Sequence, residues 1–283
     1  MPDRFHALEE TITADVARAL KEDVGTGDLT AGLIPAGRRA RARLLARQSG
    51  VLCGTEWFNR TFSTLDPEVE VFWHLGDGDP VVANSSVCEL AGDARALLTA
   101  ERTALNFLQL LSGVATRTRQ FVMAVAGTRA KILDTRKTLP GLRIAQKYAV
   151  RTGGGTNHRL GLHDGILIKE NHILAAGGIR GAVAAALRAA PPGTMVQVEV
   201  ESLAGLAEAL EAGAKLVLLD NFDLPAMREA VRVAGERAEL EASGGVHLGN
   251  VRAIADTGVH RISIGSLTKD IEALDLSLRF LHH

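Results

Sequence analysis

The sequence is poor in cysteine and in aromatic residues, and each shortage excludes a class of protein. Only two of the 283 residues are cysteines, Cys53 and Cys88, and they form no CxxC pair. A disulfide framework and a zinc–cysteine site are therefore excluded, and the reducing cytoplasm is the expected compartment. Aromatic residues make up only 4% of the chain, which disfavours single-stranded nucleic acid as a partner because its bases need stacking platforms.

Long apolar runs and a net charge are also lacking. No stretch approaches the ~20 apolar residues that a membrane-spanning helix needs, and residues 1–6 show no apolar run of the kind found in a signal peptide. Lys and Arg number 32 and Asp and Glu number 33, so the net charge is −1. We therefore expect neither a nucleic-acid nor a membrane partner. His282 and His283 close the chain and carry no weight in this interpretation.

The rest of the composition is that of a folded protein. Hydrophobic residues make up 46% of the chain and charged residues 23%, which excludes disorder for most of its length. A chain of this size forms one large domain or two ordinary ones.

The first part of the chain has a mixed α and β pattern. Apolar residues recur at helical spacing over residues 5–21. A second helix is predicted over 94–112, with Asp93 as its N-cap and Gly113 as the residue that ends it. Because this helix is apolar on two sides, we expect it to join two domains and to lie near a subunit contact. Short strands are predicted at 42–46, 68–73 and 81–82.

From residue 130 onward, short apolar strands alternate with helices, which is typical of parallel βα units. The strands are nearly continuous in Val, Ile and Leu, as expected for strands buried on both faces. The pattern suits a β/α barrel or an open doubly wound sheet. The predicted strands are 131–134, 165–169, 195–200, 215–220, 239–243 and 261–265. The predicted helices are 178–190, 202–212, 224–235 and 248–257.

Polar or charged residues follow nearly every one of these strands. In both architectures the active site forms at the carboxyl ends of the strands, so we expect these residues to meet around one cavity. They are Asp134, Arg136, Lys137, Lys169, Asn171, Glu199, Glu201, Asp220, Asn221, Ser243, Gly244, Gly245, Gly265 and Ser266.

Positive charge is concentrated between residues 129 and 169. Nine basic and two acidic residues give this segment a charge of +7, which leaves −8 for the rest of the chain. A concentrated positive field in a cleft attracts a multiply anionic ligand, and arginine suits bidentate binding of carboxylate or phosphate. The alternative is a solvated basic face.

Glycines at two late strand ends indicate a phosphate site. The segments 243–245 (Ser-Gly-Gly) and 265–266 (Gly-Ser) are similar to the late-strand phosphate sites of barrels, where backbone N–H groups hold the anion. The glycine run 153–155 also permits close approach of an anion, but it matches neither a dinucleotide fingerprint nor a P-loop.

Glu199, Glu201 and Asp220 supply the opposite charge, and the period of a strand places Glu199 and Glu201 on the same face. Carboxylates beside a polyphosphate and a sugar can hold Mg²⁺, directly or through water, or stabilise a developing positive charge. Salt bridges to the many basic groups are the alternative. The histidines lack the spacing of a zinc site, and no nucleophile motif such as GxSxG is present. The residues therefore predict a β/α enzyme that binds a phosphate-bearing substrate with Mg²⁺ and a second anionic ligand.

Seven segments of the chain closely resemble the quinolinate phosphoribosyltransferase family, also called carboxylating nicotinate-nucleotide pyrophosphorylases. The resemblance runs from about residue 22 to residue 278, in the family's order. The segments are ERTALN (101–106), DTRKTLPG (134–141), GGGTNHR (153–159), LIKENH (167–172), VEVE (198–201), LDN (219–221) and EASGG (241–245).

The resemblance implies a two-domain α/β fold and a reaction. Residues 1–112 would form an α/β sandwich, to which 270–283 return, and 113–269 an open TIM-like barrel with fewer than eight strands. The assembly would be a homodimer with shared active sites, or a hexamer of such dimers. Quinolinate and phosphoribosyl pyrophosphate would give nicotinate mononucleotide, pyrophosphate and CO₂, with Mg²⁺ as cofactor, in the synthesis of NAD.

The resemblance also implies roles for individual residues. The expected catalytic residues are Lys137, Lys169, Glu199 and Asp220, of which the last two would lie near Mg²⁺. Arg102 would reach quinolinate from the neighbouring subunit. Its carboxylates would be bound by Arg136, His158 and Arg159, with Lys137 and Lys169 beside them. The 5′-phosphate would be held by Ser243, Gly244, Gly245 and Gly265. Lys269 stands where the family often has His, and it would meet phosphate as a point charge.

Two alternatives remain open. A relative with the same fold could use another substrate, such as a molybdenum-operon paralogue or a non-decarboxylating phosphoribosyltransferase. Four cationic side chains argue against this, since a monocarboxylate needs fewer: Arg102, Arg136, His158 and Arg159. A non-enzymatic protein could instead bind anions or RNA through the +7 segment, which the low aromatic content disfavours.

Overall fold

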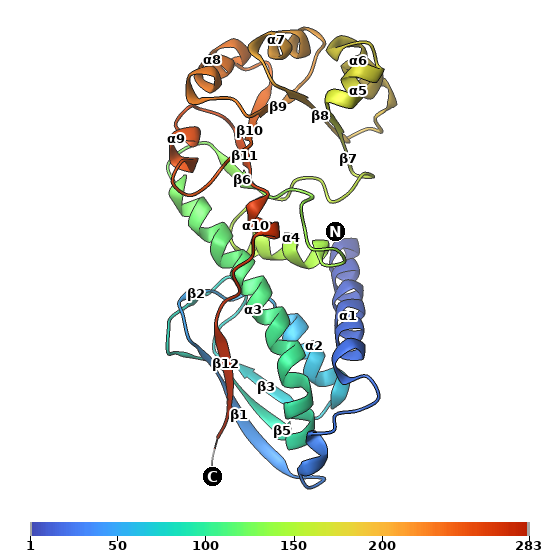
Figure 1. The fold of residues 1–283 in the computed structure, drawn as a ribbon, viewed down its shortest axis with the longest axis vertical. Helices are drawn as coiled ribbons and strands as arrows, with labels where there is room; N and C mark the ends of the chain where they lie inside the picture. The colour runs from blue at the N-terminus through green and yellow to red at the C-terminus, as the bar shows by residue number, and fades with distance from the viewer. Residues whose placement is uncertain (1, 282–283) are drawn as a thin grey trace. The chain divides into compact units, whose positions relative to one another are not determined.

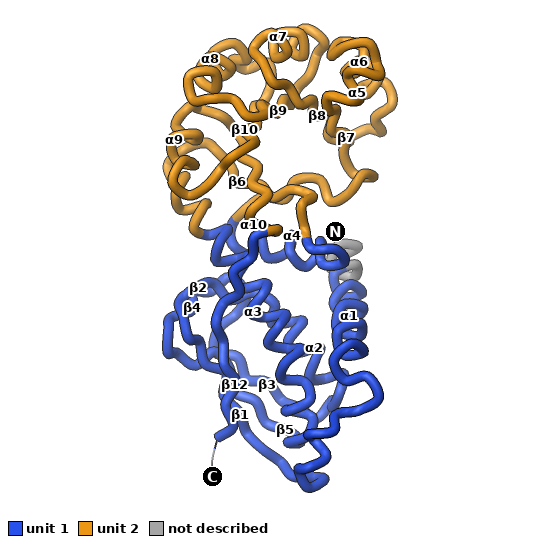
Figure 2. Tube along the Cα trace, viewed as in Figure 1, with its two compact units in different colours: residues 1–119, 139–154, 270–283 blue, residues 120–138, 155–269 orange. Residues whose placement is uncertain are grey.

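The computed structural model describes residues 2–281, with side chains from residue 8 onward, so His282 and His283 lie outside the described residues. The chain divides into two compact units (Figure 2). Unit 1 comprises residues 1–119, 139–154 and 270–283, and unit 2 comprises 120–138 and 155–269. Helix α3 (Ala94–Ala124) has residues in both units. This division by spatial contact places 113–119 and 139–154 with unit 1, and the domain boundaries drawn from the sequence stay a prediction.

Unit 1 is built on a four-stranded antiparallel sheet with the order β12-β1-β5-β3. Buried side chains alternate along β1 and β5, and this apolar face packs against α2 and α3 around a core that includes Leu44, Phe58, Leu90 and Leu108. The elements are α1 (Pro2–Val24), η1 (Ala31–Leu33), β1 (Arg39–Ala46), β2 (Gly50–Val51), α2 (Thr55–Leu65), β3 (Glu70–Trp73), β4 (Pro80–Val81), β5 (Ser86–Asp93), α4 (Arg143–Thr152) and β12 (Leu276–Phe280).

Unit 2 is a six-stranded parallel sheet with helices on its outer side (Figure 1). The strand order is β6-β11-β10-β9-β8-β7, and no described residues pair β6 with β7, so the barrel is open. The expected fold class is thereby confirmed. The elements are β6 (Lys131–Leu133), β7 (Gly165–Ile168), α5 (Glu170–Ala175), α6 (Ile179–Ala189), β8 (Met195–Val200), α7 (Leu203–Glu211), β9 (Leu216–Asp220), α8 (Leu224–Ala234), β10 (Glu239–Ser243), α9 (Val251–Ala255), β11 (Arg261–Ser263) and α10 (Ser266–Lys269).

Helix α3 begins where the sequence predicts and ends later. The carboxylate of Asp93 accepts hydrogen bonds from the backbone N–H groups of Arg95 and Ala96 at 2.9 and 3.1 Å, which confirms its role as the cap. The expected end at Gly113 is wrong, because the helix continues to Ala124. A Cβ atom at Gly113 would lie 2.2 Å from the carbonyl oxygen of Glu272, so this glycine admits a neighbouring backbone instead of ending the helix.

A side chain at Gly113 is expected to destabilise the protein. Gly113→Ala should lower the free energy of unfolding by about 1–3 kcal/mol, because backbone cannot move aside as a flexible side chain can. Chemical denaturation would measure the change. Gly32→Ala is the control, since its added Cβ would meet nothing within 4 Å. Equal stability of the two variants would contradict the close approach.

Candidate active site

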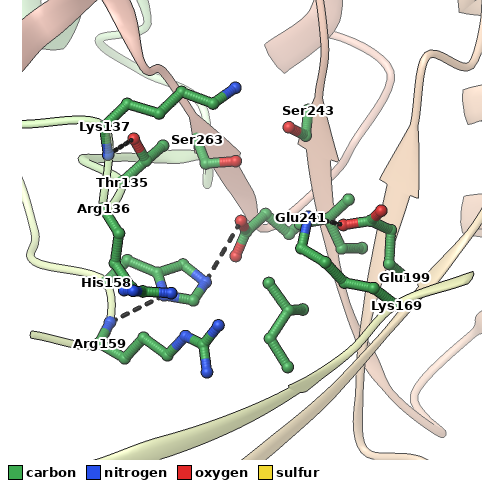
Figure 3. Close-up of a pocket in the computed structure, with 12 residues that line it drawn as sticks. Thr135, Arg136, Lys137, His158, Arg159, Lys169, Glu199, Glu241, Ser243 and Ser263 are labelled. Atoms are coloured by element: carbon green, nitrogen blue, oxygen red, sulfur yellow. Dashed lines mark hydrogen bonds and ion pairs between the residues drawn. The ribbon is translucent and has the colours of Figure 1, made fainter. Parts of the chain in front are cut away.

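Unit 2 contains a cavity of about 310 Å³ within its strands (Figure 3). Its wall carries four cationic side chains and two carboxylates, so the net charge is two positive when His158 is neutral. The lining residues are Thr135, Arg136, Lys137, His158, Arg159, Leu167, Lys169, Glu199, Leu218, Glu241, Ser243 and Ser263. The volume and polarity suit a small anionic ligand.

The period of the strands explains why these side chains meet. Alternate residues of a strand share one face, and the face that lines the cavity carries Glu199 of β8 and both Glu241 and Ser243 of β10. Leu218 of β9 lies in register with both Glu199 and Glu241, so the two carboxylates flank it. Polar groups therefore occupy the inner face of neighbouring parallel strands.

Arg136 and Lys137 lie in the loop that follows β6. The backbone N–H of Lys137 donates to the hydroxyl oxygen of Thr135 at 3.0 Å, and the hydroxyl of Thr268 donates to the carbonyl of Lys137 at 2.7 Å. A Cβ atom at Gly265 would lie 3.0 Å from Cδ of Lys137. Glycine at this strand end thus leaves room for the lysine chain, and the loop holds both cations at the cavity.

Arg159 is a partly buried cation of the wall. Its guanidinium donates to the carbonyl of Gly165 at 2.8 Å. Burial lowers the pKa of Arg159, and the nearby charge of Arg136 lowers it further, although Asp164 opposes both effects. Two cations so close together indicate a site that gains energy when an anion enters.

Asp164 stabilises the loop after Arg159 through hydrogen bonds to its backbone. Its two carboxylate oxygens accept the backbone N–H groups of Leu160 and Gly161 at 2.7 and 2.8 Å. Burial raises the pKa of Asp164, but these hydrogen bonds outweigh it and leave the pKa below its ordinary value. The carboxylate is therefore charged at neutral pH and keeps the loop closed.

Lys169 and Glu199 face each other across the cavity wall. The ammonium nitrogen lies 3.1 Å from a carboxylate oxygen of Glu199, and half of the lysine side chain is exposed. The backbone N–H of Lys169 donates to Nδ1 of His172 at 3.0 Å, which fixes the start of α5. An incoming anion would compete with Glu199 for the lysine, because the exposed ammonium can turn toward either partner.

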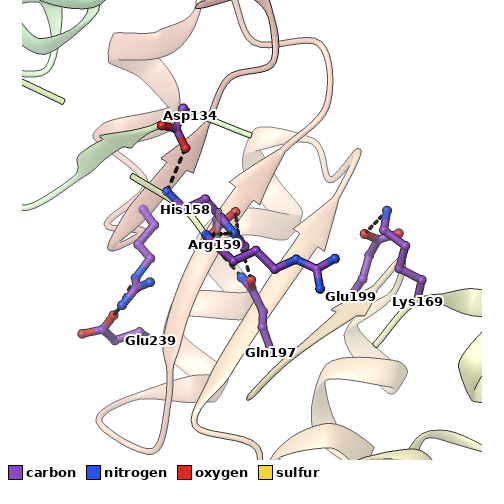
Figure 4. Close-up of polar contacts among 9 residues, drawn as sticks. Asp134, His158, Arg159, Lys169, Gln197, Glu199 and Glu239 are labelled. Atoms are coloured by element: carbon purple, nitrogen blue, oxygen red, sulfur yellow. Dashed lines mark hydrogen bonds and ion pairs between the residues drawn. The ribbon is translucent and has the colours of Figure 1, made fainter. Parts of the chain in front are cut away.

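A buried polar network lies beside the cations (Figure 4). Asp134 is fully buried and accepts the backbone N–H of His158 at 2.8 Å and the amide of Asn157 at 2.6 Å. His158 in turn contacts Gln197 and Glu241. These contacts anchor the segment that follows the glycine run to the residue after β6 and to strands β8 and β10.

The backbone turns into the left-handed region after β9 and after β10, which favours glycine after β10. Gly244 and Gly245 have φ angles of +98° and +61°, and Asn221 also lies in the left-handed region, at +54°. A Cβ atom at Gly244 would lie 2.1 Å from the amide oxygen of Asn221. The amide nitrogen of Asn221 donates to the carboxylate of Asp220 at 3.0 Å. These ends are thus built as one closely packed corner.

The structure brings together seven of the residues that the sequence singles out. Those lining the cavity are Arg136, Lys137, His158, Arg159, Lys169, Glu199 and Ser243. The others in unit 2 lie on the strand ends and on α10 without lining it: Asp220, Gly244, Gly245, Gly265 and Lys269. Arg102 lies on α3 in unit 1 and is exposed. The roles assigned to all of these residues stay predictions.

Sequence reasoning missed several polar residues of this region. Thr135, Glu241 and Ser263 line the cavity, and Gln197 is buried next to it. Strand alternation carries a usable signal, because Gln197 lies two residues before Glu199 and Glu241 two before Ser243. A polar residue inside an apolar strand, on the face of a site residue, is the pattern that could have found them.

The carboxylates suit a metal that arrives with its substrate. Among residues 8–281, no group of three or more His, Cys, Asp or Glu side chains is arranged to hold a metal ion. Glu199 is the next-to-last residue of β8 and Asp220 the last residue of the neighbouring β9, and Mg²⁺ is commonly bound by one or two carboxylates together with substrate phosphates. Two such carboxylates would suit Mg²⁺ that is bound together with a phosphate-bearing ligand, and the expected cofactor stays a prediction.

Comparison with known proteins shows which family the chain belongs to. Residues 26–112 match the model described as the N-terminal domain of quinolinate phosphoribosyl transferase, and residues 114–279 match its C-terminal domain. The chain belongs to the quinolinate phosphoribosyltransferase family. The resemblance read from the seven sequence segments is confirmed.

Relatives of the family are similar over nearly their whole length. The probable carboxylating nicotinate-nucleotide pyrophosphorylase of Bacillus subtilis is 43% identical over 257 residues, which cover 91% of this chain and 89% of that protein. The carboxylating enzyme of Mycobacterium leprae is 42% identical and covers 97% of each chain. The solved nicotinate-nucleotide pyrophosphorylase of Francisella tularensis is 44% identical, with a TM-score of 0.92 over 96% of this chain and 97% of that one.

No helix within the described residues of this family member combines the length and the apolar character needed to cross a bilayer.

Proposed function

We propose that this chain is a quinolinate phosphoribosyltransferase that makes nicotinate mononucleotide, pyrophosphate and CO₂ from quinolinate and phosphoribosyl pyrophosphate, in de novo NAD biosynthesis. The observation that carries this proposal is the cationic cavity at the strand ends of a chain whose two halves both match the family. Relatives with that activity in their names are more than 40% identical to it.

The charge of the cavity suits quinolinate. Four cations and two carboxylates leave two positive charges, which balances a pyridine dicarboxylate. Arg136 and Arg159 can each bind a carboxylate through two parallel N–H groups, and Lys169 adds a compact charge beside them. A ligand with one carboxylate would leave part of this charge unmatched.

The reaction needs placement and charge rather than an activated nucleophile. The ring nitrogen of quinolinate forms a bond to the anomeric carbon of the sugar as the bond to pyrophosphate breaks, and the electron pair leaves with pyrophosphate. Glu199 and Asp220 would stabilise the positive charge that develops on the sugar. The cationic ring then accepts the electron pair of the breaking carbon–carboxylate bond, CO₂ departs, and a proton replaces it. Arg136, Lys137 and Lys169 would hold the reacting groups together.

The proposal also covers the phosphate site, the metal site and the assembly of the protein. Ser243, Gly244, Gly245, Gly265 and Lys269 would surround the 5′-phosphate. Glu199 and Asp220 would hold Mg²⁺, which supplies charge neutralisation for pyrophosphate. The protein would act in the cytoplasm as a homodimer, or as a hexamer of dimers, in which Arg102 completes the neighbouring site.

A product assay tests the function directly. The protein is incubated with quinolinate, phosphoribosyl pyrophosphate and Mg²⁺, and nicotinate mononucleotide and CO₂ are followed together. Equal amounts of both products are expected, because each transfer is followed by one decarboxylation. In a parallel reaction nicotinate replaces quinolinate and should give little product. Preference for nicotinate, or absence of CO₂, would refute the proposal.

A further inference from the structure

Both ring nitrogens of His158 are occupied by protein atoms. Nδ1 accepts the backbone N–H of Arg159 at 2.8 Å, and Nε2 lies 2.9 Å from the side-chain oxygen of Gln197. Since a neutral imidazole carries one proton, the acceptor role of Nδ1 places that proton on Nε2, which then donates to Gln197. Both ring nitrogens thus contact protein atoms in this structure, and the ring forms part of the cavity wall.

The chain of hydrogen bonds continues to a buried carboxylate. Because the oxygen of Gln197 accepts from His158, its amide nitrogen faces Glu241 and donates to Oε2 at 3.0 Å. The three side chains come from the segment before β7, from β8 and from β10. The link from Gln197 to Glu241 passes over β9 inside the barrel, where side chains of alternate strands form one layer.

Burial shields these hydrogen bonds from water. Gln197 and Glu241 are fully buried, and only 7% of the His158 side chain is exposed. The second oxygen of Glu241 makes no hydrogen bond among the described residues and lies 3.7 Å from Nε2 of His158. The amide of Gln197 is thus the hydrogen-bond donor that the structure gives this buried carboxyl group.

We propose that Gln197 and Glu241 are positioning residues for Arg159. They hold His158 with its proton on Nε2, so that Nδ1 accepts the backbone N–H of Arg159 and directs that residue's guanidinium to the cavity. This relay, defined as Glu241, Gln197, His158 and the N–H of Arg159, rests on the proposed function only for the identity of the anion that Arg159 binds.

Substitutions that exchange the carboxylate and the amide of the relay test the proposal. In Gln197→Glu, two carboxylates would lie side by side and the bond to Glu241 would be lost, so we expect KM for quinolinate to rise about tenfold or more while KM for phosphoribosyl pyrophosphate changes little. Glu241→Gln keeps an acceptor for Gln197 and so leaves the hydrogen bonds of the relay in place; its KM for quinolinate is the reference for the double variant.

The double variant is the matched control. With Gln197→Glu and Glu241→Gln combined, the new carboxylate accepts both from His158 and from the new amide, so every hydrogen bond of the relay is remade. We expect KM for quinolinate to return to the level of Glu241→Gln. A double variant as impaired as Gln197→Glu would overturn the proposal, as would equal increases of both KM values in Gln197→Glu.

A measurement on the unmodified protein covers the case in which Gln197→Glu does not fold. The ¹⁵N shifts of the His158 ring, assigned by comparison with His158→Asn, report which nitrogen carries the proton. The proposal requires that the neutral ring carry its proton on Nε2, and a neutral ring with its proton on Nδ1 would overturn it. This readout needs no substrate, so its failure is distinct from failure of the wild-type product assay, which tests the proposed function.

Discussion

Loss of one cavity cation is expected to lower kcat/KM for quinolinate by about 100-fold or more, in Arg136→Ala and in Lys169→Ala alike. The guanidinium of Arg136 can bind a carboxylate through two N–H groups, which an ammonium group cannot do. Lys169 carries the only ammonium within 4 Å of Glu199 among the described residues. Each substitution removes a positive charge from a cavity that would bind a dianion. Steady-state kinetics with both substrates varied would measure the loss.

Two substitutions elsewhere in unit 2 serve as controls for lost charge. Arg188→Ala removes an exposed arginine at the end of α6, and Lys131→Ala an exposed lysine at the start of β6, the end of the sheet away from the cavity. Both should retain kcat/KM within about twofold, since they leave the cavity wall intact. Near-normal kinetics in Arg136→Ala and Lys169→Ala together would show that the cavity is not the site.

Gly244→Ala is expected to raise KM for phosphoribosyl pyrophosphate about 30-fold or more. The new Cβ would lie 2.1 Å from the amide oxygen of Asn221, and the backbone would have to hold φ at +98° with a side chain present. Both effects displace the corner that joins Asp220 to the end of β10, where the 5′-phosphate is proposed to bind. Kinetics with limiting phosphoribosyl pyrophosphate would show the change.

Gly245→Ala separates backbone strain from the clash. Its φ is +61°, but its added Cβ would meet nothing within 4 Å, so it carries strain alone. We therefore expect a clearly smaller rise in KM than for Gly244→Ala. Equal effects of the two variants would mean that contact with Asn221 plays no part.

Much of unit 2 could be predicted because its signals are local. Six apolar runs predicted six strands, and the observed strands match them to within one or two residues, for example 195–200 at β8 and 239–243 at β10. Strands buried on both faces must be apolar throughout, so the run itself marks the strand. Polar residues after these runs then fall at one edge of the sheet, as found for Lys169 and Ser243.

Unit 1 was harder to predict because its sheet depends on pairing between distant residues. Strand β1 lies between β5 and β12, and Leu44 faces Leu278 in the register. Helix α2 and strands β5 and β12 had no predicted counterpart. The predicted helix end at Gly113 was wrong for a similar reason. Glycine is needed there because the backbone of Glu272, far away in sequence, lies against it.

The sequence by itself determined the family, the parallel βα pattern and the kinds of charged groups at the strand ends. Only the tertiary structure decided which of these groups share a cavity. It also brought the buried side chains of Gln197 and Glu241 into one series of hydrogen bonds with His158. The physical reason is that strand alternation gives each residue a face, while closure of the sheet decides which faces meet. Gln197 and Glu241, 44 positions apart in sequence, become hydrogen-bond partners only because β8 and β10 curve around the same interior.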